Sequence, residues 1–196
     1  MKNLIFVFFF VITNKSFSQI DLGIKGGVNL ASFVEKNKDI TQKNYIGAEF
    51  GLALNWVFSK HFSIETGIDY SMKGTQAKTI LVPNYSINAV HYLQMPFSLV
   101  FLTGTQRSFF RFEAGSGIYL ANLLSAQTDN LNLKNLYYQT DFGTSHWIGV
   151  RLGVLSNDWL VLRTVFSRGF VDITKTPSTF VQNQVVKIQL IWFFPL

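Results

Sequence analysis

A two-residue alternation of apolar and polar side chains recurs along most of this chain and constrains its fold more than any other feature. In residues 45–58 every even position is apolar, whereas the odd positions include Gly47, Glu49 and Asn55. Successive side chains of a β-strand point to opposite faces of the sheet. The pattern therefore predicts a strand with one apolar face and one face of small and polar residues.

Eight segments follow this alternation, and each is long enough for the 9–11 residues that a tilted membrane strand requires. Short polar joins alternate with longer ones, which is typical of outer-membrane barrels whose short turns are periplasmic. Since an even number of antiparallel strands closes without a free edge, we predict an all-β, eight-stranded antiparallel up-and-down transmembrane β-barrel. The segments are residues 20–30, 45–58, 62–73, 89–102, 109–121, 140–154, 159–171 and 184–193. The short joins are 59–61, 103–108 and 156–158, and the long joins are 34–44, 74–88, 122–139 and 172–183.

Period two alone does not separate a membrane barrel from a soluble one, which would bury its apolar face and expose its polar face. Glycine distinguishes the two, because it weakens strands and yet eleven of the fourteen glycines lie on the polar face. The interior of a narrow barrel favours small residues, and the bulky apolar side chains would overfill it. We therefore predict that the apolar face contacts lipid. The eleven glycines are Gly23, Gly27, Gly47, Gly51, Gly67, Gly115, Gly117, Gly143, Gly149, Gly153 and Gly169.

This orientation places the charged residues of the strands inside the barrel. An unpaired buried charge is costly, so the near balance of cations and carboxylates predicts a structural network of salt bridges that fills the lumen. The alternative is a path for protons or ions. Eight strands leave an interior that side chains nearly fill, and a wide pore is not expected. The network is expected to comprise Lys25, Glu49, Glu65, Asp69, Arg111, Glu113, Arg151, Arg163 and Lys187.

The first eighteen residues have the features of a secretory signal peptide. Lys2 precedes a nine-residue apolar run at residues 4–12, and Ser18 ends a small-residue motif of the kind that a signal peptidase recognises. The run is too short for a transmembrane helix. We expect cleavage after Ser18, which leaves a signal at residues 1–18 and a barrel domain at residues 19–196. A buried N-terminal strand or a membrane anchor is the alternative.

Composition and motifs exclude several classes of function. The chain has no cysteine, which removes lipoprotein anchoring, disulfides and thiolate metal sites. Its net charge of +6 is scattered rather than clustered, so no nucleic-acid partner is expected. The sequence contains no glycine-rich phosphate loop, no His-Glu-x-x-His motif and no calcium loop. No cofactor and no metal are therefore expected.

The three histidines are the candidates for catalysis. Ser145-His146 resembles half of a hydrolase pair, but adjacent strand residues face opposite sides and cannot form a nucleophile–base pair. We therefore expect no enzyme and interpret His146 as an interfacial residue. His61 is expected in a periplasmic turn, and His91 near the outer leaflet.

The tryptophans and the longest connecting segment indicate what lies at the two ends of the barrel. Tryptophan favours membrane–water interfaces, and the assigned orientation places Trp56, Trp159 and Trp192 at the periplasmic rim. At the other end, residues 122–139 are polar and aromatic. Exposed loops often carry function, so this segment is a candidate recognition surface, with a solvated loop as the alternative.

Two segments resemble a known family. Residues 23–33 read Gly-Ile-Lys-Gly-Gly-Val-Asn-Leu-Ala-Ser-Phe, and residues 92–97 read Tyr-Leu-Gln-Met-Pro-Phe. They resemble the opening strand and the Tyr-Leu-Glu-Ile-Pro strand of the porin-like outer-membrane β-barrel family of Bacteroidetes, the PorT-like group. Gln94 stands where that family usually has an acid. The resemblance covers the mature chain and implies a barrel rather than an activity; one branch of the family is associated with type IX protein secretion.

The leading hypothesis is a non-enzymatic, monomeric barrel in a bacterial outer membrane. It would have a structural role or a role in envelope and surface interactions, with an association with protein secretion as an extension of that role. Its expected partners are outer-membrane lipid, lipopolysaccharide and an envelope or surface protein contacted by the long loops. A narrow ion or small-solute channel and a lipid-active outer-membrane enzyme are the alternatives.

Overall fold

The computed structural model describes residues 19–35, 41–78, 86–105, 108–128, 131–154, 158–176 and 180–196. The expected signal peptide lies outside the described residues. Eight long strands dominate the fold, namely β1 (Gln19–Glu35), β2 (Thr41–Val57), β3 (Phe62–Lys78), β4 (Ser86–Leu102), β5 (Phe110–Thr128), β7 (Thr140–Gly153), β8 (Trp159–Gly169) and β9 (Val181–Pro195). Two short elements follow β5, namely β6 (Leu131–Asn132) and the 3-10 helix η1 (Lys134–Leu136).

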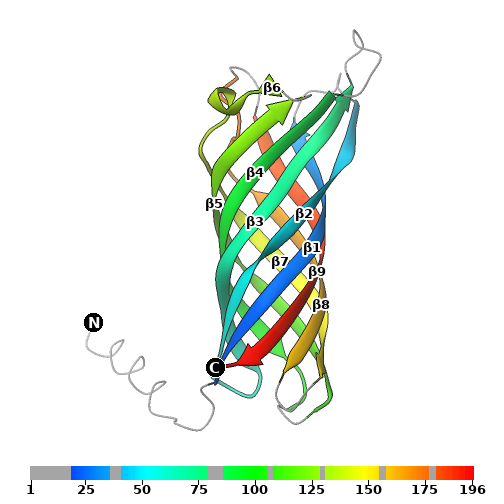
Figure 1. The fold of residues 1–196 in the computed structure, drawn as a ribbon, viewed down its shortest axis with the longest axis vertical. Helices are drawn as coiled ribbons and strands as arrows, with labels where there is room; N and C mark the ends of the chain where they lie inside the picture. The colour runs from blue at the N-terminus through cyan, green and yellow to red at the C-terminus, as the bar shows by residue number, and fades with distance from the viewer. Residues whose placement is uncertain are drawn as a thin grey trace, which may run out of the picture.

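The eight long strands form one closed antiparallel barrel (Figure 1). Each long strand pairs with the next long strand along the chain, and β6 pairs only with the end of β5. The pairing of β1 with β9 joins the two ends of the sheet. Closure leaves no long strand with an unpaired edge, which is the condition for placing strands in lipid. The predicted eight-stranded up-and-down architecture is confirmed.

The apolar parity of the strands faces outward, as the glycine pattern predicts. Ile24, Ile46 and Ile148 expose 60%, 67% and 71% of their surface, which water would penalise and lipid would not. We call this outward surface the apolar belt. It comprises the outward side chains within residues 20–30, 46–56, 62–72, 93–101, 110–120, 142–152, 160–166 and 186–194.

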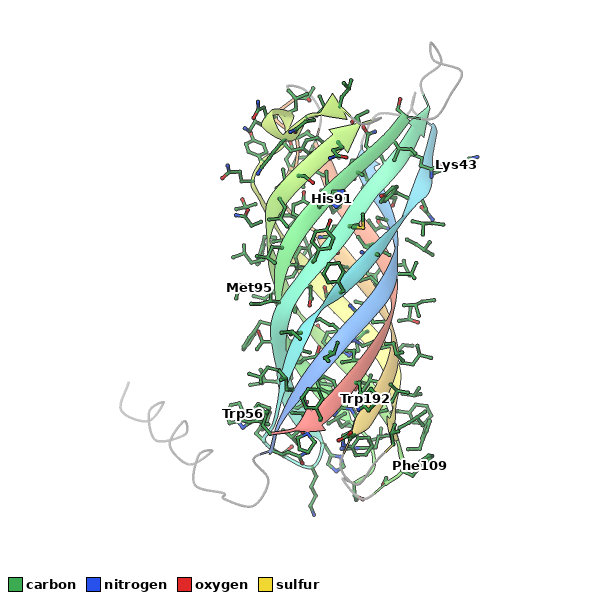
Figure 2. The ribbon with its side chains drawn as sticks, viewed as in Figure 1. Lys43, Trp56, His91, Met95, Phe109 and Trp192 are labelled. Atoms are coloured by element: carbon green, nitrogen blue, oxygen red, sulfur yellow. The ribbon has the colours of Figure 1, made fainter. Side chains whose placement is uncertain are left out.

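The height of the apolar belt fits a membrane. Ten residue steps in β1, at roughly 3.3 Å each and a tilt of about 40°, rise about 25 Å, the height of the apolar band of outer-membrane barrels. Above the belt, polar residues such as Asn44, Gln76 and Asn122 appear at outward positions, beside the apolar Ile87 and Leu124. Below it, Trp56 and Trp192 lie outward at the end that carries the short turns, which we assign to the periplasm (Figure 2).

Six of the eight long strands are longer than the sequence predicts, whereas β7 and β8 end slightly earlier than expected. β1 to β4 each contain 17 residues and β5 contains 19, so positions expected in the long joins belong to strands. The alternation of apolar and polar side chains ends at the extracellular edge of the apolar belt. The backbone hydrogen bonds between β3, β4 and β5 continue beyond that edge. The described part of the chain contains no helix of sufficient length and hydrophobicity to span a membrane.

The lumen contains apolar clusters as well as polar residues, a feature that the sequence analysis missed. One cluster near the periplasmic end contains Ala53, Trp159, Val161, Ile191 and Phe193. A larger cluster lies at the extracellular end and contains Phe33, Val90, Tyr92, Tyr119, Ala121, Leu123, Ala126, Tyr137, Ile173 and Val181. A third cluster contains Val100, Leu102, Trp147 and Val165. Charged residues lie against all three clusters, as Lys73 does against Tyr119, Arg151 against Phe193 and Arg163 against Trp147.

Candidate functional site

Arg163 on β8 is the centre of the lumen network. Its guanidinium donates to both carboxylate oxygens of Glu65 on β3, at 2.9 and 2.7 Å, and its Nε donates to Gln189 Oε1 at 2.8 Å. Glu113 Oε1 lies 3.7 Å from Arg163 Nη1. Such a bidentate arrangement satisfies most of the donors of a buried guanidinium, so Arg163 joins strands on opposite walls of the barrel.

Two lysine–carboxylate pairs surround this centre. Lys25 Nζ lies 2.7 Å from Asp69 Oδ1, and Lys187 Nζ donates to Glu49. All four side chains are buried. Each pair connects strands that are not neighbours in the sheet, and the pairs therefore cross-link the barrel through its interior.

The periplasmic half of the lumen is organised by two arginines. Arg151 pairs with Glu113, with Nη2 at 3.1 Å from Oε2. Arg111 is also buried, but it donates to the backbone oxygens of Thr103 and Lys60, both at 2.8 Å. Arg111 therefore holds two periplasmic turns together, and no carboxylate pairs with it among the described residues.

A third group, near the extracellular cluster, was not included in the expected network. Asp141 Oδ2 accepts from Lys73 Nζ at 3.0 Å, from Asn183 Nδ2 at 2.8 Å and from the Tyr119 hydroxyl at 3.2 Å. The Lys73 amine also lies 5.0 Å from the centroid of the Tyr92 ring. Alternation places both Lys73 and Asp141 on the inward parity of their strands, but it does not show that the two side chains meet across the barrel.

The charges of the lumen balance within the described residues. Six buried cations face six buried carboxylates, which removes the net charge that a low-dielectric interior would penalise. A cavity between the central pairs measures only about 20 Å³, room for about one water molecule. The cations are Lys25, Lys73, Arg111, Arg151, Arg163 and Lys187, and the carboxylates are Asp21, Glu49, Glu65, Asp69, Glu113 and Asp141.

The extracellular end carries an ordered lid, which we define as residues 131–139 and 170–176. Tyr138 N donates to Ile173 O at 2.9 Å, and Lys175 N donates to Leu136 O at 2.8 Å. Tyr137 turns into the extracellular apolar cluster, and burial raises the pKa of its phenol. The two segments therefore hold each other in place over the β5, β7 and β8 side of the barrel (Figure 1).

The lipid-facing surface contains a serine–histidine pair that the sequence analysis missed. Ser145 turns inward and lies 2.8 Å from the Ser167 hydroxyl, so it does not contact His146. Instead, His146 Nδ1 lies 2.9 Å from Ser116 Oγ, on the neighbouring strand β5. The pair occupies the middle of the belt rather than the interface expected for His146, and the cross-strand register that brings the two together is invisible to a local pattern.

The positions expected for His61 and His91 agree with the structure, whereas the orientation expected for Trp159 does not. His61 lies in the turn between β2 and β3, and His91 lies on β4 within 2.5 Å of the Tyr70 hydroxyl. Trp159 is at the height of the rim but turns inward, where its ring lies 5.7 Å from the Arg111 guanidinium. The outward side chains of β8 are at even-numbered positions, so the odd-numbered Trp159 faces the lumen and does not anchor the barrel at the membrane interface.

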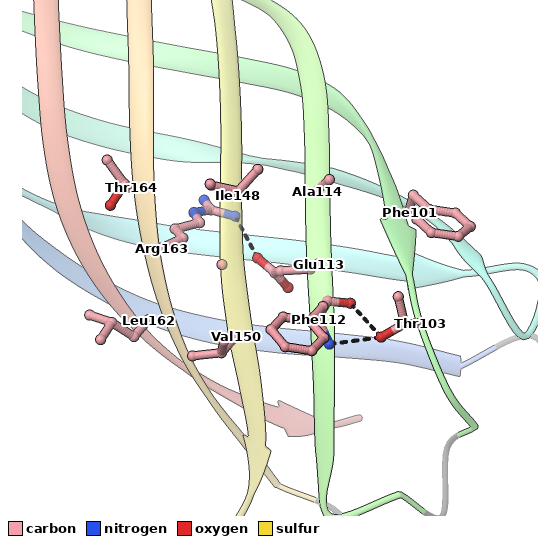
Figure 3. A pocket seen from close by; sticks show the side chains of 11 residues that line it. Phe101, Thr103, Phe112, Glu113, Ala114, Ile148, Val150, Leu162, Arg163 and Thr164 are labelled. Carbon is pink, nitrogen blue, oxygen red and sulfur yellow. Dashed lines mark hydrogen bonds and ion pairs between the residues drawn. The ribbon is translucent and has the colours of Figure 1, made fainter.

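Two hollows lined by described residues interrupt the apolar belt. The first, of about 590 Å³, lies over β5, β7 and β8 between Phe112, Ile148 and Leu162. Glu113 and Arg163 contribute to its floor, and their charged groups approach each other behind it (Figure 3). The second hollow, over β1, β8 and β9, measures about 660 Å³. Among the described residues, no group of three or more His, Cys, Asp or Glu side chains is placed to hold a metal ion.

A closed barrel with a membrane-high apolar belt and a salt-bridged lumen defines an integral outer-membrane β-barrel protein. Residues 14–175 match the family model of the outer membrane protein beta-barrel domain, and the chain belongs to this family.

Solved structures share the fold. OprG from Pseudomonas aeruginosa superimposes with a TM-score of 0.58 at 14% identity, covering 92% of this chain and 97% of that one. Neisserial surface protein A gives a TM-score of 0.54 at 14% identity, covering 89% and 97%. No curated protein matches the sequence. At these identities the likeness concerns the fold alone.

Proposed function

We propose that this protein is a non-enzymatic outer-membrane barrel whose extracellular lid contacts an envelope or surface partner. One contrast carries the proposal: the lumen is filled, whereas the lid exposes apolar side chains above the belt. Leu131, Leu136 and Tyr138 expose 67%, 52% and 47% of their surface. Exposed apolar residues that cluster in an ordered segment are typical of interaction sites.

The charges of the lid favour an anionic partner surface. Lys175 is exposed, Lys134 is partly exposed, and Arg168 lies outward on β8 just above the belt. The neighbouring carboxylate of Asp172 is already occupied, because it accepts from the backbone of Thr174 at 3.0 Å and from other groups in its own loop. Guanidinium and ammonium groups bind phosphate well, so lipopolysaccharide is a suitable neighbour for this sector.

Further features complete the proposal. We propose that the chain is exported by a signal peptide cleaved after Ser18, that it is monomeric, and that it belongs to the PorT-like group of Bacteroidetes, one branch of which is associated with protein secretion. The residues that resemble this group, 23–33 and 92–97, lie in β1 and β4. The mass of the purified mature chain tests the cleavage site, because a chain that begins at Gln19 has one expected mass.

Site-specific photocrosslinking in intact cells tests the role of the lid. A crosslinkable residue at Leu136 should yield a discrete adduct with an envelope or surface component. The same residue at Asn44 is the matched control, since Asn44 is exposed above the belt on β2, which is three strands from β5 and four strands from β7 around the barrel. Equal adducts at the two positions, or none at Leu136, would contradict the proposal.

A second candidate, a lipid-active enzyme, is favoured by one observation. Ser116 and His146 are hydrogen-bonded on the lipid-facing surface, beside the hollow that Ile148 lines. The pair lies in the middle of the belt, where water for hydrolysis is scarce. Purified protein incubated with lipopolysaccharide and phospholipid should leave both intact. Acyl release by the wild type that disappears in Ser116→Ala would establish the enzyme instead.

A further inference from the structure

The second hollow of the belt exists because of one outward-facing glycine. Gly26 lies on the outward parity of β1 between Ile24 and Val28, and a Cβ added there would meet one atom within 4 Å, Glu49 O at 3.9 Å. The missing side chain leaves open space that we call the Gly26 hollow. Its apolar walls are formed by Ile24, Leu160, Leu190, Trp192 and Phe194.

The periplasmic end of the Gly26 hollow carries a carboxylate. Asp158 immediately precedes β8 and is half-buried, and its Oδ2 accepts a hydrogen bond from Trp192 Nε1 at 3.2 Å. Lys25 also contributes to the lining, but its amine turns into the lumen toward Asp69. Among the described residues that line the hollow, Asp158 is therefore the one whose charged group lies on the outer surface of the barrel.

The apolar walls and the carboxylate of the Gly26 hollow follow each other along the barrel axis in the same order as the acyl chain and the headgroup of a lipid. The apolar space lies within the belt, and the carboxylate lies at the rim, where Trp192 marks the membrane–water interface. A chain in the hollow would replace the missing packing contacts above Gly26, and a cationic headgroup would meet the carboxylate. An anionic headgroup would be repelled from the same position.

We propose that the Gly26 hollow binds one acyl chain of a periplasmic-leaflet phospholipid whose headgroup carries a primary amine, and that Asp158 receives this amine. The first hollow provides a contrast within the same molecule. Its charged residues, Glu113 and Arg163, belong to the lumen network, so none of the described residues that line it places a charged group at the rim. Headgroup selectivity is accordingly expected at the Gly26 hollow alone.

Native mass spectrometry of the purified barrel tests the proposal. The protein is released from micelles containing equal amounts of phosphatidylethanolamine and phosphatidylglycerol, and the lipid-bound species are counted. The wild type should retain one phosphatidylethanolamine with a preference of up to about fivefold, the upper range for a partly exposed ion pair. Asp158→Asn should keep lipid binding and lose this preference.

Two filling variants separate the Gly26 hollow from general lipid adhesion. Gly26→Leu should lose the retained phosphatidylethanolamine, whereas Ala114→Leu, which fills the first hollow, should keep it. Heat-modifiable migration on gels verifies that both variants fold. Equal retention by Gly26→Leu and wild type, a preference that survives Asp158→Asn, or no preference in the wild type would each overturn the proposal.

Discussion

Arg163 is the residue on which the lumen network converges, because its guanidinium contacts Glu65, Glu113 and Gln189. Removing one partner of a buried ion pair leaves an uncompensated charge, which typically costs about 3–5 kcal/mol. We expect Arg163→Met to lower the free energy of unfolding by about that amount, measured by urea titration in detergent micelles.

Two further variants isolate the interaction from the loss of a large side chain. The double variant Arg163→Met with Glu65→Gln should be less destabilised than the sum of the single variants, by roughly 1–3 kcal/mol. Arg168→Met changes an exposed arginine on the same strand and should stay within about 0.5 kcal/mol of wild type. Similar losses from the two arginine variants would contradict the central role of Arg163.

Gly115 shows how closely the lumen is packed. A Cβ at this position would lie 2.1 Å from Cζ2 of the Trp147 ring, so Gly115→Ala forces the indole to move. We expect a loss of about 1–3 kcal/mol in unfolding free energy, as for other overpacked cores, partly recovered by adding Trp147→Phe. Gly26→Ala is the control, since its Cβ enters open space. A loss of similar size for Gly26→Ala would show that replacing glycine destabilises the barrel through its backbone conformation rather than through steric overlap of the added Cβ.

At the scale of the strands, hydropathy and pairing mark different boundaries. The outward apolar residues end at Leu30 in β1, but the strand continues to Glu35. The sequence pattern therefore follows the apolar belt and underestimates the length of six strands, although it slightly overestimates β7 and β8. Cross-strand neighbours such as Ser116 and His146 depend on register, which the alternation of a single segment does not specify.

The belt makes a depth-dependent prediction. Ile148 lies near the middle of the outward residues of β7, whereas Gln184 lies just above the belt on β9. Ile148→Arg should cost about 2–4 kcal/mol and Gln184→Arg only about 0–1 kcal/mol, as lipid-facing arginines do at the midplane and near the interface. Urea unfolding in lipid vesicles measures both. Equal costs would mean that the belt is misplaced along the barrel axis.

At the scale of the molecule, ion pairs and three apolar clusters occupy the described part of the lumen. The cavity of about 20 Å³ between the central pairs is too small for a hydrated ion path. We expect the purified protein in planar bilayers to show no steady single-channel conductance. Reproducible, ion-selective steps would favour the channel alternative and would require the network to rearrange.

The lumen also shows which parts of the network were predictable. The inward parity places Lys25, Glu49 and Lys187 correctly inside, since parity alone decides which face a strand residue occupies. It does not choose partners: Arg111 binds turn carbonyls rather than a carboxylate, and Asp141 completes a group with Lys73. Partner choice depends on height and on distance across the barrel, which arise only when the sheet closes.

Taken by itself, the alternation of side chains determined that this chain forms a lipid-facing barrel of eight strands, because a period of two fixes the two faces and glycine identifies the crowded one. The tertiary structure decided the rest: the pairs in the lumen, the lid held by Tyr138 and Lys175, and the hollow beside Gly26. Each of these joins residues from different strands or loops, and their meeting depends on register and closure rather than on any local sequence pattern.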